Sequence, residues 1–136
     1  MKIQRVLFAI RDYIAMNVTE LQGRVYVKKP SAGPWTEVPL PYIQIFSSAS
    51  RIPEKRYTDV YHILMILNLF SKTVESLQSL GESVIALFEH QWVKLDGAVI
   101  EVELLGSDYL GYVDAYNAYQ SSITFDVIVL EKGSRP

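Results

Sequence analysis

A long, nearly continuous run of residues with high β-propensity, Thr58–Phe70, lies near the middle of this 136-residue chain. A run of this length and composition is typical of a central strand that is covered on both faces. The remaining segments therefore have to supply the neighbouring strands and the layers that cover them.

Two segments show the apolar spacing of amphipathic helices. The stripe of the first, within residues 3–16, consists of Ile3, Val6, Leu7, Ile10 and Ile14. Asn17 is expected to end this helix in the left-handed conformation, and Ser71 is expected to cap the second helix. The stripe of the second helix consists of Val74, Leu77, Leu80, Val84, Leu87 and Phe88.

Four further strands are predicted from short β-rich or alternating stretches between turn signals. They are Gly23–Lys28, Tyr42–Phe46, Val99–Leu105 and Tyr119–Leu130. The alternation in the third of these predicts a core face and an opposite face that carries Glu101 and Glu103. The residues expected on its core face are Ile100, Val102 and Leu104.

Three stretches are predicted to be loops. Residues 30–41 hold four of the six prolines, with Trp35 at their centre, a composition that forbids regular structure. Residues 47–57 are polar and basic and suit a hairpin tip, and residues 106–118 are rich in Gly, Asp and Tyr. Leu95–Ala98 contains the Asp-Gly pair of a tight hairpin turn.

These elements predict an α+β fold. Strands outnumber helices, and each helix has one apolar stripe, so both helices fit on one face of a single sheet. We expect a two-layer sandwich with a mostly antiparallel sheet of about five strands, forming a single domain over residues 1–136. The length suits one domain, and 49% hydrophobic with 21% charged residues is ordinary globular usage.

The charge is unevenly distributed along the chain. Residues 1–56 carry nine Lys/Arg and four acidic residues, whereas residues 57–136 carry four Lys/Arg and eleven acidic residues. Halves of opposite sign suit two faces that meet between copies of a homo-oligomer, or they reflect scatter over a solvated surface. The net charge of −2 argues against a general nucleic-acid binder.

No targeting or membrane segment is predicted. Lys2 and Arg5 lie among the apolar positions of residues 1–10, unlike in a signal peptide. The longest apolar run, Ile63–Leu67, is far shorter than the roughly 20 residues that a membrane span needs. We therefore expect a cytosolic protein, or one assembled in a cytosol.

No catalytic, metal or cofactor site is predicted. The chain has no cysteine, so disulfides and thiolate chemistry are excluded. His62 and His90 are not in ligand spacing, and they are expected to be a core or edge residue and a helix-end residue. Glu101 and Glu103 share a strand face, where a solvated or interface role is favoured over acid–base work. No nucleophile elbow or phosphate-binding loop occurs.

Two groups of exposed residues are candidates for contacts. Tyr109, Tyr112, Tyr116 and Tyr119 either anchor an interface or fold back over the sheet as a lid. The basic residues either line a channel for a phosphate backbone or belong to solvated loops. They are Lys28, Lys29, Arg51, Lys55 and Arg56.

The pattern resembles the tail-completion or tail-terminator proteins of long-tailed bacteriophages and related prophages. The resemblance covers nearly the whole chain, and its most specific parts are the strands Gly23–Tyr26 and Leu40–Ile45, in this order. The other parts are the long strand with His62, a helix containing Val84–Phe88 and a last strand containing Phe125–Val129.

The resemblance implies an α+β subunit that forms a ring, usually of six copies, and that carries no catalytic motif. Such a ring caps the tail tube, stops its polymerisation and joins it to the head-side connector. The implied partners are further copies of the chain, the major tail tube protein, the connector, and double-stranded DNA that passes through the lumen. The implied location is the tail or neck of the virion, with assembly in the host cytoplasm.

The resemblance also assigns roles by region. The basic residues Arg51, Lys55 and Arg56, with Lys28 and Lys29, are expected to face the lumen or the tube. The segments that carry Trp35 and the three tyrosines Tyr109, Tyr112 and Tyr116 are expected to meet neighbouring subunits.

Three other interpretations stay open at this point. The first is a head–tail connector or neck subunit, which sequence does not separate from a terminator. The second is a small enzyme or ligand-binding domain that uses a pocket between the sheet and the helices. A pocket that holds His62 and a carboxylate with a shifted pKa would favour this interpretation. The third is an adaptor that pairs by strand addition at a sheet edge.

Overall fold

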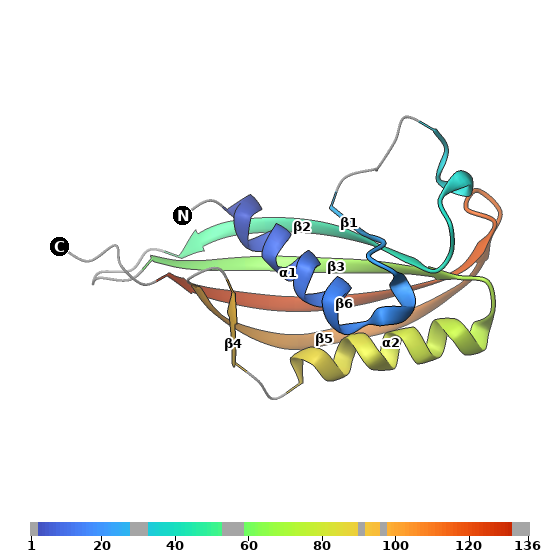
Figure 1. Cartoon of the computed structure of the whole chain (residues 1–136). Helices are drawn as coiled ribbons and strands as arrows, with labels where there is room; N and C mark the ends of the chain where they lie inside the picture. Colours follow the sequence, from blue (N-terminus) through green and yellow to red (C-terminus); the bar gives the residue numbers. More distant parts are fainter. Residues whose placement is uncertain (1–2, 28–32, 53–58, 90–91, 96–97, 132–136) are drawn as a thin grey trace.

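Two helices and one six-stranded sheet make up the computed structural model of the chain (Figure 1). The structure describes residues 3–27, 33–52, 59–89, 92–95 and 98–131. In chain order the elements are α1 (Ile3–Asn17), a 3₁₀ turn (Thr19–Leu21), β1 (Val25–Tyr26), a second 3₁₀ turn (Trp35–Glu37), β2 (Tyr42–Ile52), β3 (Asp59–Ser71), α2 (Val74–Phe88), β4 (Trp92–Leu95), β5 (Ala98–Val113) and β6 (Ala118–Glu131).

The strands lie in the order β1-β2-β3-β6-β5-β4. Strand β1 runs parallel to β2, and every other neighbouring pair is antiparallel. The predicted α+β class, with a mostly antiparallel sheet and two helices, is confirmed. Strand β4 was not predicted. It has only four residues and lies beside the tight-turn signal.

Both helices pack on one face of the sheet, which is called the inner face below. The predicted stripe of α1 is buried at Val6, Leu7, Ile10 and Ile14. Helix α1 ends at Asn17, but Asn17 does not adopt the left-handed conformation expected of it. The chain turns in that conformation at Gln22 instead, where φ is 49°, after a further 3₁₀ turn.

Helix α2 follows β3 directly and covers the inner face beside α1. Its cap is Thr73 rather than Ser71, because the Thr73 hydroxyl accepts a hydrogen bond from the Ser76 backbone N–H at 3.1 Å. Ser71 is buried and donates through its hydroxyl to the Ser76 hydroxyl at 2.6 Å. The predicted stripe is buried at Leu77, Leu80, Val84 and Phe88, whereas Leu87 is partly buried and Val74 is 40% exposed in the first turn.

Strand β3 lies inside the sheet, as its sequence predicts, but it is not covered along its whole length on both faces. Its inner-face residues Ile63, Met65 and Leu67 are fully buried under the helices. On the other face, called the outer face below, Leu64 is 41% exposed, whereas Phe70 is fully buried. Covering of the outer face is therefore confined to one end.

An aromatic cluster provides that cover. Trp35, from the proline-rich segment, stacks on Tyr42 with ring centroids 5.1 Å apart. Tyr42 stacks on Phe70 at 4.9 Å, and Tyr116 contacts Phe70 at 4.5 Å. The proline-rich segment thus contributes to a second core in addition to forming a connection, because its apolar residues cover the end of the outer face.

Two stretches predicted as loops are largely strands. Residues 47–52 continue β2, and residues 106–113 continue β5, so that only residues 114–117 form the turn before β6. Consecutive residues on the two faces are exposed in both stretches, such as Ser47 and Ser48 in β2 and Ser107 and Asp108 in β5. Two register shifts in β5, at Leu104/Gly106 and Tyr109/Gly111, accommodate residues of poor strand propensity. Residues 53–57 of the predicted hairpin tip lie outside the described residues.

Candidate functional site

The exposed apolar side chains of the described residues are concentrated on β5. Nine large hydrophobic residues are exposed, and five of them lie within one nine-residue stretch of this strand. These five form the β5 patch: Leu104, Leu105, Tyr109, Leu110 and Tyr112. A cluster of this kind on a small protein marks a surface that binds another molecule.

The β5 patch lies on a strand that is largely unpaired on one side. Strand β4 pairs only with the segment Ala98–Glu101 of β5. From Val102 to Val113, no strand among the described residues pairs with the side of β5 that faces away from β6. Backbone N–H and C=O groups of such an edge are available to another chain. Leu104, which was expected on the core face, is 44% exposed here.

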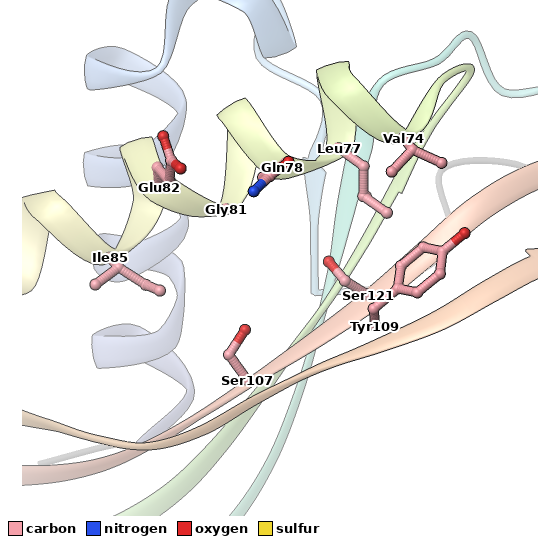
Figure 2. A pocket seen from close by; sticks show the side chains of 9 residues that line it. All are labelled: Val74, Leu77, Gln78, Gly81, Glu82, Ile85, Ser107, Tyr109 and Ser121. Carbon is pink, nitrogen blue, oxygen red and sulfur yellow. The ribbon is translucent and has the colours of Figure 1, made fainter.

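A groove of about 420 Å³ runs between α2 and β5 (Figure 2). The helix contributes Leu77, Gly81 and Ile85 to its wall, and the strand contributes Ser107 and Tyr109. A second hollow of about 230 Å³ follows along the same strand. It is lined by Ile85, Phe88, Glu89, Val102, Glu103, Leu104 and Phe125. Helix α2 therefore leaves the inner face of β5 partly open along most of its length.

The structure brings together two of the three predicted interface tyrosines. Tyr109 and Tyr112 are both about half exposed on β5, and Tyr109 points into the groove (Figure 2). Tyr112 packs edge-on against Tyr119 and donates a hydrogen bond through its hydroxyl to the Asn117 side chain. These tyrosines are strand residues and form neither a loop nor a lid.

Tyr116 and Trp35 lie elsewhere, in the aromatic cluster of the outer face. Both are partly buried there, Tyr116 against Phe70 and Trp35 against Tyr42. Burial in the subunit's own core leaves less of each ring for a neighbour than the β5 patch offers. Their role in a subunit contact stays a prediction.

The basic residues are placed only in part. Arg51 belongs to β2, near its end. Lys28, Lys29, Lys55 and Arg56 lie outside the described residues. Their orientation toward a lumen or a tube stays a prediction.

The outer face carries His62, Glu101 and Glu103, which were weighed for chemistry, whereas His90 lies outside the described residues. The Nδ1 atom of His62 lies 3.3 Å from the Oδ1 atom of Asp126 on the neighbouring strand. Glu101 and Glu103 are exposed on β5, opposite the core face as predicted. Neither His62 nor Asp126 lines either of the two hollows. The described residues contain no group of three or more His, Cys, Asp or Glu side chains that could hold a metal ion.

Tyr42 is the one titratable group with a strongly perturbed environment among the described residues. Burial raises the pKa of its phenol above the ordinary value, and the neighbouring phenols Tyr116 and Tyr26 add to this. The Tyr42 hydroxyl and the Gln44 side-chain nitrogen are both buried without a hydrogen-bond partner. This environment belongs to the aromatic cluster, and it accounts for stability rather than for chemistry.

A signal for the full extent of β5 was present in the sequence. The predicted strands Thr58–Phe70 and Tyr119–Leu130 are long, and a long strand inside a sheet needs neighbours of similar length. The predicted strand Val99–Leu105 is too short for this, and no proline between Leu105 and Val113 prevents its extension. Matching strand lengths would therefore have extended β5 and placed Leu110 beside Tyr109 on an edge.

Neither described helix has the length and apolar content that are needed to cross a membrane. No family model matches the chain, and no curated protein matches it. The fold is similar to that of a chain in a solved structure, the virion of a native gene transfer agent (GTA) particle. The TM-score is 0.68 at 12% identity, and the match covers 92% of this chain and 97% of the other. The two chains share the fold over nearly their whole lengths.

Proposed function

We propose that this chain is a virion structural protein, a tail-terminator subunit that forms a ring at the end of a tail tube and joins it to the head-side connector. The observation that carries the proposal is the fold shared with a chain of a virion over 92% of this chain and 97% of that one. The sequence resemblance to tail-completion proteins supports the same class. Its location is then the tail or neck of a virion.

The surface of the chain suits such a role. The β5 patch and the adjoining groove offer an apolar surface with an unpaired strand edge. Both features are typical of surfaces that bind another protein. In this proposal the protein works by binding its neighbours and catalyses no reaction. The interpretation as a small enzyme loses support, because His62 and its Asp126 partner lie on the outer face, away from both described hollows.

A tube-growth assay tests the proposal. The major tail protein of the same virion is polymerised into tubes with increasing amounts of this chain, and tube lengths are measured by negative-stain microscopy. We expect the mean length to fall as the chain is added, with extra density at one end of each tube. Unchanged lengths and bare ends would contradict a terminator, and density on head connectors alone would instead assign a neck role.

The basic residues provide a second test. Replacement of Arg51, Lys55 and Arg56 by serine removes three positive charges from the segment that is proposed to face the lumen. We expect folding, followed by circular dichroism, to be unchanged and particle assembly or genome passage to be impaired. A control replaces the exposed residues Lys72, between β3 and α2, and Lys94, on β4. Full infectivity of the triple variant would reject the lumen role.

A further inference from the structure

The sheet has a second unpaired edge besides that of β5. Strand β1 pairs only with Ile43 and Gln44 of β2. From Ile45 to Ile52, no strand among the described residues lies on the side of β2 that faces away from β3. Phe46 on this segment is 52% exposed. The two free edges bound opposite sides of the same sheet.

Resting on the proposed ring, we infer that the free edge of β5 in one copy pairs with the free edge of β2 in the next copy, so that the sheets join into one continuous sheet around the ring. The partner at Leu104 and Leu105 of the β5 patch is then a second copy of this chain, whereas Tyr109 lies level with Ile43, which already pairs with β1. The contact joins two different surfaces, the β5 edge of one copy and the β2 edge of the next. Repeated contacts of this type close into a ring when the rotation between neighbouring copies divides a full turn.

The two edges are free at the same level of the sheet over the segments Ile45–Ala49 of β2 and Val102–Ser107 of β5. Ser48 lies opposite Leu64, Leu64 lies opposite Asp126, and Asp126 lies opposite Glu103. Ser48 on the β2 edge is therefore level with Glu103 on the β5 edge. Neither residue is paired on its outer side by a described strand, so copies related by rotation about an axis along the strands bring these positions near each other.

The strand directions and the shape of β5 suit the same seam. The three intervening pairings are all antiparallel, so β2 and β5 run in opposite directions. A rotation about an axis along the strands keeps these directions, and the new seam is an ordinary antiparallel pairing. The two register shifts bend β5, and closing a sheet on itself requires such curvature.

Charge selects β2 over a second β5 as the partner. Strand β2 lies in the half of the chain that holds nine Lys/Arg and four acidic residues, and its free segment contains no acidic residue. The exposed side chains of β5 include Glu101, Glu103 and Asp108. Pairing β5 with another β5 brings carboxylates of two copies along one seam, which is unfavourable. Pairing β5 with β2 instead brings them beside a segment that contains one arginine, Arg51, and no acidic residue.

Engineered cysteines test the seam, since the natural chain has none. Within one copy Ser48 and Glu103 lie three strand spacings apart, about 14 Å. This exceeds the Cα separation of about 7 Å that a disulfide tolerates, so any disulfide between the two positions joins two copies. The full chain carrying S48C and E103C is oxidised in the presence of tail tubes and analysed on non-reducing gels, with L105C replacing E103C to test a shifted register.

We expect one register to convert most of the chain into a ladder of multimers that ends at the closed ring. The control pair S48C and E82C, in which Glu82 is exposed on α2, is expected to give only background. Disulfide-linked dimers of the single variant E103C would show that β5 of one copy pairs with β5 of another, which would overturn the inference. Rings in the microscope without cross-links in any register would overturn it and leave the proposed function intact. Unchanged tube lengths together with no assembly would overturn both.

Discussion

At the scale of single residues, the hydroxyl of Tyr42 is the group whose environment departs most from water. It is fully buried without a hydrogen-bond partner, and burial raises the pKa of the phenol above its ordinary value. The folded state therefore holds this proton more tightly than the unfolded state. The resulting contribution to stability is complete below about pH 10, the ordinary pKa of tyrosine, and is lost at higher pH.

Tyr42→Phe tests this account. We expect the free energy of unfolding, from urea titrations at pH 8 and pH 11, to fall less between these pH values in the variant than in the natural chain. The other eight of the nine tyrosines are present in both proteins, so the difference between the two changes isolates Tyr42. Equal falls would place the Tyr42 hydroxyl in water and contradict the buried cluster.

At the scale of elements, Gly81 of α2 and Gly111 of β5 make a matched pair. A methyl group added at Gly81 meets Ile123 and Leu69 side-chain atoms at 3.9 Å, an ordinary contact distance. Gly111 has φ of +86°, where an L side chain is strained. We expect Gly81→Ala to raise the free energy of unfolding by about 0.5–1 kcal/mol and Gly111→Ala to lower it. Thermal unfolding measures both, and a destabilised Gly81→Ala would contradict the packing of α2.

The elements also show what the sequence can and cannot predict. Helices α1 and α2 follow from apolar periodicity and strand β3 from its long β-rich run, because the helices bury most of their predicted stripes and β3 buries its inner face in the core. The second half of β5 was missed, because local composition around Gly111 resembles a loop and its strand state depends on pairing with β6. The aromatic cluster was missed for a related reason. Trp35 contacts Tyr42 only through the tertiary fold.

The candidate site was predicted in part. Tyr109 and Tyr112 were identified as interface residues and lie on the β5 patch, although on a strand rather than a loop. Leu105 and Leu110 were not singled out, since an isolated leucine in a sequence does not reveal that its strand is an edge. Edges are a property of the sheet order, which places β4 and β1 as short outer strands that leave β5 and β2 mostly unpaired.

At the scale of the whole molecule, the arrangement of the sheet fits the proposal that this chain works together with neighbouring subunits. One face is covered by two helices, and the outer face is covered at one end by the aromatic cluster. Two strand edges and a string of exposed leucines and tyrosines remain. Unpaired edges with apolar side chains are a hazard for a solitary protein, and they are useful in a subunit whose edges are covered by identical copies.

The most direct test of ring formation at a tube end is electron cryomicroscopy of the capped tubes, with averaging of end-on and side views of the tip. We expect a rotationally symmetric ring, of six copies as the resemblance implies, seated on one end of the tube with an open lumen. A tip without added density, or copies of the chain bound along the tube wall without rotational symmetry, would contradict the account.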